Sequence, residues 1–116
     1  MITMRLQPEI YDSFINGTKR FEIRLLDEKR KQLKVGDIIK IMKRPDYTET
    51  FDAKVEELLF FNNFNEVFDS IDNSLLFNEP YTRESLLEEL NKFYPPEEQE
   101  ELGVVGIRLS ICKDKC

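Results

Sequence analysis

The middle of the chain holds three strand-like segments with no helical pattern between them. "RFEIRL" (residues 20–25) alternates apolar and charged side chains, "VGDIIKIM" (35–42) is a turn and then an Ile-rich strand, and "TFDAKVEELLFF" (50–61) alternates again. Parallel neighbours need a crossover of a dozen or more residues, usually a helix. These segments therefore favour antiparallel pairing and argue against a doubly wound parallel sheet.

Further strand patterns stand at both ends of the chain. "ITMRL" (2–6) predicts a short first strand, and "GVVGIRLSI" (103–111) predicts a closing strand. Between the first two strands lies "QPEIYDSFINGTK", in which Pro8 suits the first turn of a helix and Gly17 suits the stop after it. We expect a short helix there.

"TRESLLEELNKFY" (82–94) carries the clearest helical pattern in the chain. Thr82 is a suitable N-cap, and Pro95-Pro96 are expected to end the helix. The order strand–helix–strand–strand–strand, then helices, then strand, predicts an α+β protein. Its centre would be a small, mostly antiparallel β-barrel or curled sheet with inserted helices.

The length of 116 residues allows one hydrophobic core. We expect a single domain over residues 1–111, followed by a frayed tail, residues 112–116. The tail holds Cys112 and Cys116, and a chain without histidine offers them no further zinc ligands, so we expect reduced thiols and no metal or cofactor. No apolar run approaches the roughly 18 residues that span a bilayer, and no signal peptide is visible, so no membrane contact and a cytoplasmic location are the default.

Positive charge gathers in the first part of an acidic chain. The net charge is −6, yet residues 1–46 carry +4 and residues 47–116 carry −10. The basic part favours an anionic partner, and the alternative is that acidic helices simply lie beside basic strands. The acidic part argues against tight, nonspecific binding to long duplexes, which depends on many phosphate contacts.

The polar face of "RFEIRL" is the first candidate site. Glu22 and Arg24 are two residues apart on a strand and share one side with Arg20, while a sharp turn at Gly17 brings Lys19 over the same opening. Such a group binds anionic ligands or polarises a carbonyl. The alternative is a solvated strand face with surface ion pairs worth about 0–1 kcal/mol.

Two other features suggest ligand contacts. The loop "DEKRKQLK" (27–34) offers Lys29, Arg30 and Lys31 to phosphate, or is a solvated hairpin tip. Tyr81 is the tyrosine best placed to stack a base, with packing at the barrel rim as the alternative. The residues expected in the core instead are Phe60, Phe61, Phe64 and Phe68.

The pattern G-x-K-x-x-E-x-R, formed by Gly17, Lys19, Glu22 and Arg24 and followed by "VGDII", resembles the ASCH domain. The resemblance extends from the opening strand–helix–strand to the closing strand, and is weakest over residues 47–80. It implies the PUA-like β-barrel that ASCH domains share with several RNA-modification and RNA-binding proteins.

One branch of that family, the small bacterial N4-acetylcytidine amidohydrolases, is similar in a further way. Its helix ends in an aromatic-Tyr-Pro sequence, as in Phe93-Tyr94-Pro95, and its catalytic lysine and glutamate match Lys19 and Glu79. Its catalytic threonine falls on Glu22, so this chain lacks that hydroxyl nucleophile. Glu22 or Glu79 with a raised pKa could instead activate a water while Lys19 stabilises the oxyanion.

The resemblance and the charge pattern together predict an ASCH domain that binds RNA, short or single-stranded, or a modified nucleoside. The expected ligand contacts are Lys19, Arg20, Glu22, Arg24, Lys29, Arg30, Lys31 and Tyr81. One alternative is an amidohydrolase of N4-acetylcytidine or a related small amide, using Lys19 with Glu22 or Glu79. Another is a protein-interaction module in which the acidic helix and "PPEEQEEL" meet a basic partner.

Overall fold

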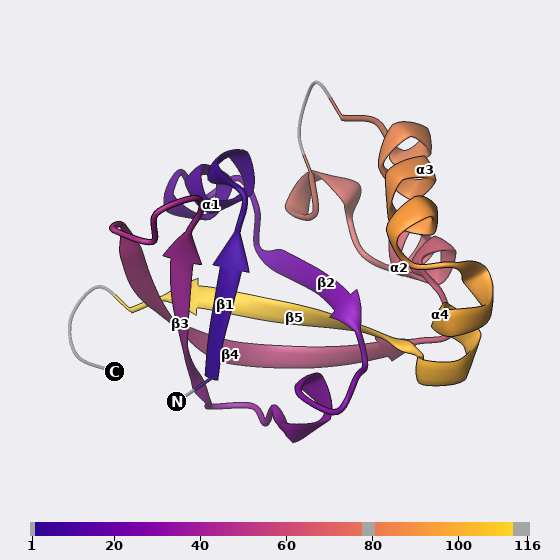
Figure 1. The fold of residues 1–116 in the computed structure, drawn as a ribbon, viewed down its shortest axis with the longest axis horizontal. Coiled ribbons are helices and arrows are strands. Elements are labelled where there is room, and N and C mark those ends of the chain that lie inside the picture. Colours follow the sequence, from indigo (N-terminus) through magenta and orange to yellow (C-terminus); the bar gives the residue numbers. More distant parts are fainter. Residues whose placement is uncertain (1, 78–80, 113–116) are drawn as a thin grey trace.

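The computed structural model describes residues 2–77 and 81–112 and shows an α+β fold (Figure 1). Within these ranges the strands are β1 (Ile2–Leu6), β2 (Phe21–Leu25), β3 (Ile38–Lys43), β4 (Thr50–Phe61) and β5 (Val104–Ile111). The α-helices are α1 (Pro8–Ile15), α2 (Phe64–Ser70), α3 (Arg83–Phe93) and α4 (Pro96–Leu102), and the short 3₁₀ helices are η1 (Arg30–Gln32) and η2 (Asn73–Leu75). The predicted fold class is confirmed.

The strands form one curled sheet in the order β1-β3-β4-β5-β2. All neighbouring pairs are antiparallel except β1 and β3, which run parallel. A register shift in β4 between Val55 and Glu57 marks a bulge, which strengthens the local bend. The two edge strands approach each other, because Nη2 of Arg24 on β2 donates to the carbonyl oxygen of Arg5 on β1 at 3.3 Å. The sheet is therefore a half-barrel whose open edge lies between β1 and β2.

Two hydrophobic clusters flank the sheet. The first joins Tyr11 and Phe14 of α1 to buried residues such as Ile39 and Ile41 of β3. The second joins Phe21, Ile23 and Leu25 of β2 to α2, with leucines of α3 packed against it. Burial of one such large apolar side chain stabilises the fold by about 1.5–3 kcal/mol. The apolar face of β2 thus holds α2 and α3 against the sheet, and its polar face is turned to the open edge.

The helix α3 ends at Phe93, before the two prolines, as expected, but the acidic segment after Pro95 forms a further short helix. Pro96 starts α4, because proline fits the first position of a helix, and Glu97 and Glu98 favour its positive N-terminus. Gln99 is buried and holds α4 in place. Its Nε2 donates to Asn91 Oδ1 at 2.8 Å and to the Tyr94 carbonyl at 2.7 Å, while its Oε1 accepts from the Phe64 N–H at 3.1 Å.

Of the expectations for single residues, those for the helix cap and for two of the core phenylalanines are confirmed, and one is wrong. Thr82 caps α3 in a capping box with Ser85, as its sequence position predicted. Phe64 and Phe68 are in the core, but Phe60 is 62% exposed, so its assignment to the core was wrong. Strict alternation from the buried Ala53 and Val55 already puts Phe60 on the outer face of β4, so its aromatic character was a misleading guide to burial.

The structure at Cys112 differs from the expected frayed tail with reduced thiols. The Cys112 N–H donates to the Asp52 carbonyl at 2.9 Å, which ties it to β4, and Cys112 is disulfide-bonded rather than a reduced thiol. Residues 113–116 lie outside the described ranges. No helix in the described ranges is both long and apolar enough to cross a membrane.

Gly103 joins α4 to β5 in a backbone conformation that other residues avoid. Its φ of 80° and ψ of 175° lie in a region used almost solely by glycine, and a Cβ there would stand 3.4 Å from the Phe61 carbonyl oxygen. We predict that Gly103→Ala lowers the free energy of unfolding by about 1–3 kcal/mol. Thermal denaturation followed by circular dichroism tests this against Glu100→Ala on exposed α4 surface, for which we expect a change within about 0.5 kcal/mol. Equal melting of Gly103→Ala and the native protein would contradict the prediction.

Candidate functional site

The turn after α1 places Lys19 at the open edge. Gly17 adopts a φ of +78°, and the backbone N–H groups of Thr18 and Lys19 both donate to the Ser13 carbonyl, at 3.0 and 3.1 Å. This compact turn carries the chain from the end of α1 into β2. The predicted role of Gly17 follows directly, because glycine reaches this left-handed conformation without steric cost.

The Lys19 ammonium is fixed by groups from three parts of the chain. Nζ donates to the Leu76 carbonyl at 3.0 Å, lies 3.5 Å from Glu22 Oε1 and stands over the Phe14 ring at 5.9 Å. The Lys19 side chain is only 10% exposed. An ammonium has three N–H donors. The two polar contacts leave one donor for a ligand.

Glu22 is the centre of an ion-pair chain, Lys19–Glu22–Arg24. Its Oε2 accepts from Arg24 Nη2 at 3.2 Å, and its Oε1 accepts from the Ile23 N–H at 3.2 Å. The Glu22 side chain is 6% exposed, so the polar face of β2 is not an ordinary solvated face. The structure brings these three predicted site residues together.

The charges around Glu22 keep it ionised. Burial by itself raises the pKa of Glu22, but Lys19, Arg24 and the hydrogen bonds from Arg24 and Ile23 outweigh burial and hold the pKa below its ordinary value. The alternative in which Glu22 activates a water requires a raised pKa, and the contacts of this carboxylate act in the opposite direction. A carboxylate in this state holds cations in place and is a poor proton acceptor.

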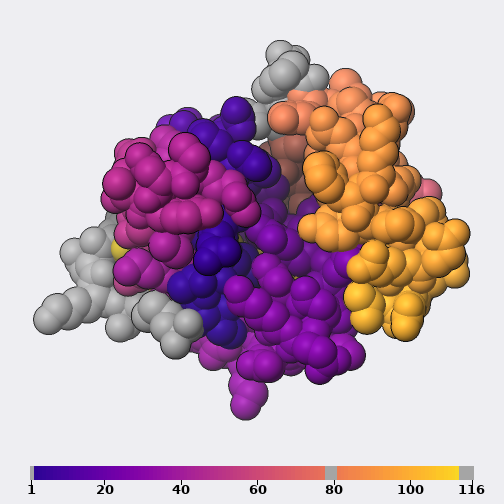
Figure 2. Space-filling view, viewed as in Figure 1, coloured from indigo at the N-terminus to yellow at the C-terminus, as the bar shows by residue number. Residues whose placement is uncertain are grey.

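A cleft of about 570 Å³ opens between α1 and α3, with Lys19 at its floor. Ile10, Leu76 and Leu90 give it apolar walls, and the aromatic rings at its rim are those of Tyr81 and Phe93. Phe93 is 78% exposed although it continues the apolar stripe of α3. Figure 2 shows this face, where the orange atoms of α3 stand apart from the indigo atoms of the first strand and helix, with purple atoms of the next segment between them.

The rim of the same cleft is acidic. Glu9 and Asp12 of α1 and Glu89 of α3 line it. Lys19 is the cation among the lining residues, and Glu22 already offsets its charge. The cleft thus suits a neutral planar group with hydrogen-bonding edges better than a phosphate.

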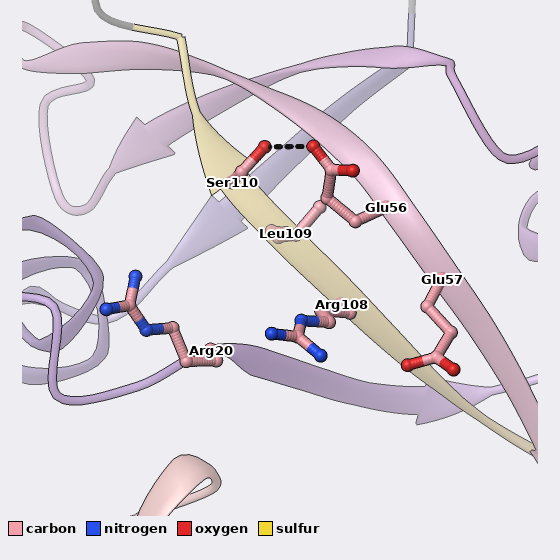
Figure 3. Close-up of a pocket in the computed structure, with 6 residues that line it drawn as sticks. All are labelled: Arg20, Glu56, Glu57, Arg108, Leu109 and Ser110. Carbon is pink, nitrogen blue, oxygen red and sulfur yellow. Dashed lines mark hydrogen bonds between the residues drawn. The ribbon is translucent and has the colours of Figure 1, made fainter.

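Arg20 lies apart from the ion-pair chain, against the expected shared face. It lines a second hollow, of about 560 Å³, along β4 and β5 with Arg108, Glu56 and Ser110 (Figure 3). Arg20 precedes β2, and its guanidinium reaches back to 3.7 Å from where a Cβ on Gly17 would stand. Strand alternation therefore does not set its direction.

The basic side chains of the loop 27–34 contact different acidic residues. Lys31 pairs with the exposed Glu28 at 3.3 Å, and Arg30 pairs with Asp27 at 3.3 Å. Lys29 has no ion pair among the described residues, and burial and then Arg30, Arg5 and Arg24 lower the pKa of its ammonium. Two of the three expected basic residues, Arg30 and Lys31, are thus already paired with acidic neighbours in the loop.

Several residues of the site carried no clear sequence signal. Phe14 and Leu76 contact Lys19, and Phe93 lines the cleft. Phe14 and Phe93 look like ordinary core positions of amphipathic helices, and a backbone carbonyl has no sequence signature. Glu79 lies outside the described residues. Among the described residues no group of three or more His, Cys, Asp or Glu side chains could hold a metal ion.

The curled sheet, the helix after β1 and the buried lysine–glutamate pair define a PUA-like α+β domain. The family model of the ASCH domain matches residues 4–111 of this chain. The chain belongs to the ASCH domain family, whose PUA-like members are associated with RNA binding.

Solved structures agree with this assignment. The crystal structure of the hypothetical protein PH0355 matches with a TM-score of 0.82 and 28% identity, over 95% of this chain and 97% of that one. The solution structure of PF0455 from Pyrococcus furiosus matches with a TM-score of 0.74 and 25% identity, over 97% of this chain and 98% of that one. The crystal structure of ASCH from Zymomonas mobilis shares the fold, with a TM-score of 0.63 and 13% identity, over 93% of this chain and 65% of that one. A search of curated proteins found no match.

The low pKa of Glu22 makes its contribution to stability depend on pH. Folding holds this pKa below its value in the unfolded chain, about 4.3, so the ionised group stabilises the fold above that pH and the effect is lost as the pH falls through the folded pKa. We predict that Glu22→Gln costs about 3 kcal/mol at pH 7, since it leaves two cations with no carboxylate between them. The difference from the native protein should shrink below about pH 4.

Urea denaturation at pH 7 and pH 3.5 measures this dependence. Glu28→Gln is the control, because Glu28 is 91% exposed and its one ion pair among the described residues is with a surface lysine, so its loss should change stability by at most about 1 kcal/mol. A Glu22→Gln deficit that is the same at both pH values would contradict the role of the ionised carboxylate.

Proposed function

We propose that this ASCH domain binds single-stranded RNA or a nucleoside-like ligand, with a base in the cleft between α1 and α3. The observation that carries the proposal is the buried ammonium of Lys19 at the floor of that cleft, with one donor uncommitted. A base carbonyl oxygen is a suitable acceptor for it. The apolar walls fit the faces of a base, and Tyr81 and Phe93 at the rim provide stacking surfaces.

Glu22 acts in this proposal as a positioning residue. It does not line the cleft, and both of its oxygens already accept hydrogen bonds or pair with cations. Its task is to hold Lys19 ionised and pointed at the ligand. Of the two roles considered for Glu22, contact with a base amine or fixation of the cations, the geometry favours the second.

We predict that Lys19→Ala weakens binding of cytidine and of a mixed-sequence RNA tetramer by about 10- to 100-fold. The basis is that a hydrogen bond from a charged donor contributes about 1.5–3 kcal/mol. Isothermal titration calorimetry measures the affinities, with circular dichroism to show that the variant remains folded.

Lys31→Ala is the matched control for that experiment. It removes the same charge from an exposed pair outside the cleft, so its affinities should stay within about twofold of the native values. If Lys19→Ala binds both ligands as tightly as Lys31→Ala does, the base does not lie over Lys19 and the proposed function fails.

The amidohydrolase alternative finds less support in the geometry where it uses Glu22; its other carboxylate, Glu79, lies outside the described residues. Glu22 stands where that branch carries threonine, and its lowered pKa opposes activation of a water. Thr18 directs its hydroxyl at the Ser13 carbonyl, 3.1 Å away, and is occupied there. Binding without turnover is the outcome that these contacts favour.

We accordingly predict no release of cytidine from N4-acetylcytidine beyond that seen with Lys19→Ala. Chromatography of reaction mixtures over several hours, with enzyme in near-stoichiometric amounts, is sensitive enough to detect slow turnover. Release by the native protein that is absent in the variant would overturn this prediction and establish an amidohydrolase that works without the threonine.

A further inference from the structure

The cleft between α1 and α3 carries carboxylates on both of its walls. Glu9 and Asp12 line it from α1, and Glu89 lines it from α3. The charge of Asp12 is offset by Lys43, whose Nζ lies 3.1 Å from Oδ1 of this carboxylate. Glu9 and Glu89 form no ion pair with the residues that the structure describes. The walls therefore present two negative charges that nothing in the described chain compensates.

Two aromatic rings of the cleft are without a ring or cation partner. Phe93 is 78% exposed and Tyr81 is 39% exposed, and neither makes a ring–ring or cation–ring contact with another described residue. Five other rings each have a cation over them, namely those of Tyr11, Phe14, Phe21, Tyr47 and Phe68. Because the face of an aromatic ring is negative, Phe93 and Tyr81 keep a free capacity for a cation.

The helical period brings these rings and carboxylates onto one surface. Residues that lie three or four apart are neighbours on a helix. The cleft-lining residues of α3 follow this spacing and are Leu86, Glu89, Leu90 and Phe93. Those of α1 and its C-cap also follow it and include Glu9, Asp12, Ser13 and Asn16. The ring of Phe93 and the carboxylate of Glu89 therefore share one face of α3, opposite the acidic face of α1.

Lys19 at the floor of the cleft does not cancel this negative charge. Its Nζ lies 3.5 Å from Oε1 of Glu22, so the charge of the ammonium is already offset, while one N–H donor stays uncommitted. The cleft thus combines a hydrogen-bond donor at its floor with uncompensated carboxylates and ring faces at its rim. A ligand that satisfies both ends has a carbonyl oxygen and a positive charge in one planar group.

We infer that the cleft selects a base with a delocalised positive charge, such as one methylated on a ring nitrogen, over an uncharged base of the same shape. The inference deepens the proposed function and rests on it for the position of the base over Lys19. The acidic rim that disfavours a phosphate favours such a cation. Glu9 and Glu89 determine the specificity for the charge, and Phe93 and Tyr81 supply the ring faces that it contacts.

The test compares two nucleosides by isothermal titration calorimetry. 3-Methylcytidine is a cation at neutral pH, and 3-methyluridine has the same ring, the same methyl group and the same O2 carbonyl but no charge. We expect the cation to bind about tenfold more tightly at low salt, with a smaller ratio at high salt because salt screens exposed carboxylates. In Glu9→Gln/Glu89→Gln this affinity ratio should fall to about one, while the affinity for 3-methyluridine stays within about twofold of the native value.

Glu28→Gln/Glu88→Gln is the matched control. It removes the same charge from two exposed carboxylates that do not line the cleft, and Glu88 directly precedes Glu89 on α3. The control should keep the ratio of the native protein. The inference is overturned if 3-methylcytidine binds the native protein no more tightly than 3-methyluridine does, or if the control lowers the ratio as much as Glu9→Gln/Glu89→Gln does.

Failure of the proposed function gives a different result, because it appears as binding of the uncharged nucleosides that does not depend on Lys19. In that case N-methylpyridinium, a planar cation without an acceptor for Lys19, is titrated while backbone amide NMR signals are followed. Shifts at Glu89 and Phe93 that disappear in Glu9→Gln/Glu89→Gln would support the cation site on its own. Absence of such shifts in the native protein would overturn it.

Discussion

The contacts of the Glu22 carboxylate with Lys19 and Arg24 hold the site together. A buried carboxylate is unstable unless it is paired, and the two cations and the Ile23 N–H supply those pairs. Through Lys19 the group reaches the carbonyl of Leu76, directly after η2, and through Arg24 it reaches the carbonyl of Arg5 on β1. One ionised group thus ties the turn after α1, both edges of the half-barrel and the segment that leads to α3.

The position of β2 explains why the site forms there. Its apolar face, with Phe21, Ile23 and Leu25, packs against α2 and α3 and fixes one wall of the cleft. Its polar face meets β1 and α1 at the open edge, where the sheet leaves hydrogen-bonding capacity unused. Because both faces of β2 are covered, its charged side chains are shielded from solvent. Lys19 and Arg24 therefore lie together at this edge even though the protein as a whole is acidic.

Much of this arrangement follows from local pattern. Alternation placed Glu22 with Arg24, and the glycine at position 17 marked the turn. The antiparallel pairing of β3 with β4 followed from strands without a crossover, whereas β2 pairs with the distant β5. Predictions failed at positions whose environment depends on contacts between distant segments of the chain. Alternation misplaced Arg20, which precedes the strand, and the apolar character of Phe60 misled although the strand period puts it outside. The helix α4 after the two prolines was not foreseen, because Gln99 finds its buried partners only in the folded chain.

The sequence by itself determined the fold class, the family and the identity of the residues in the ion-pair chain, because strand period, helix stops and a spaced motif are local properties of the chain. Only the tertiary structure decided that Glu22 is buried and ionised, that Lys19 keeps a donor toward a cleft, and that Arg24 reaches the backbone of β1. Those features depend on which distant segments meet, since burial and the fields of neighbouring charges are set by packing across the whole domain.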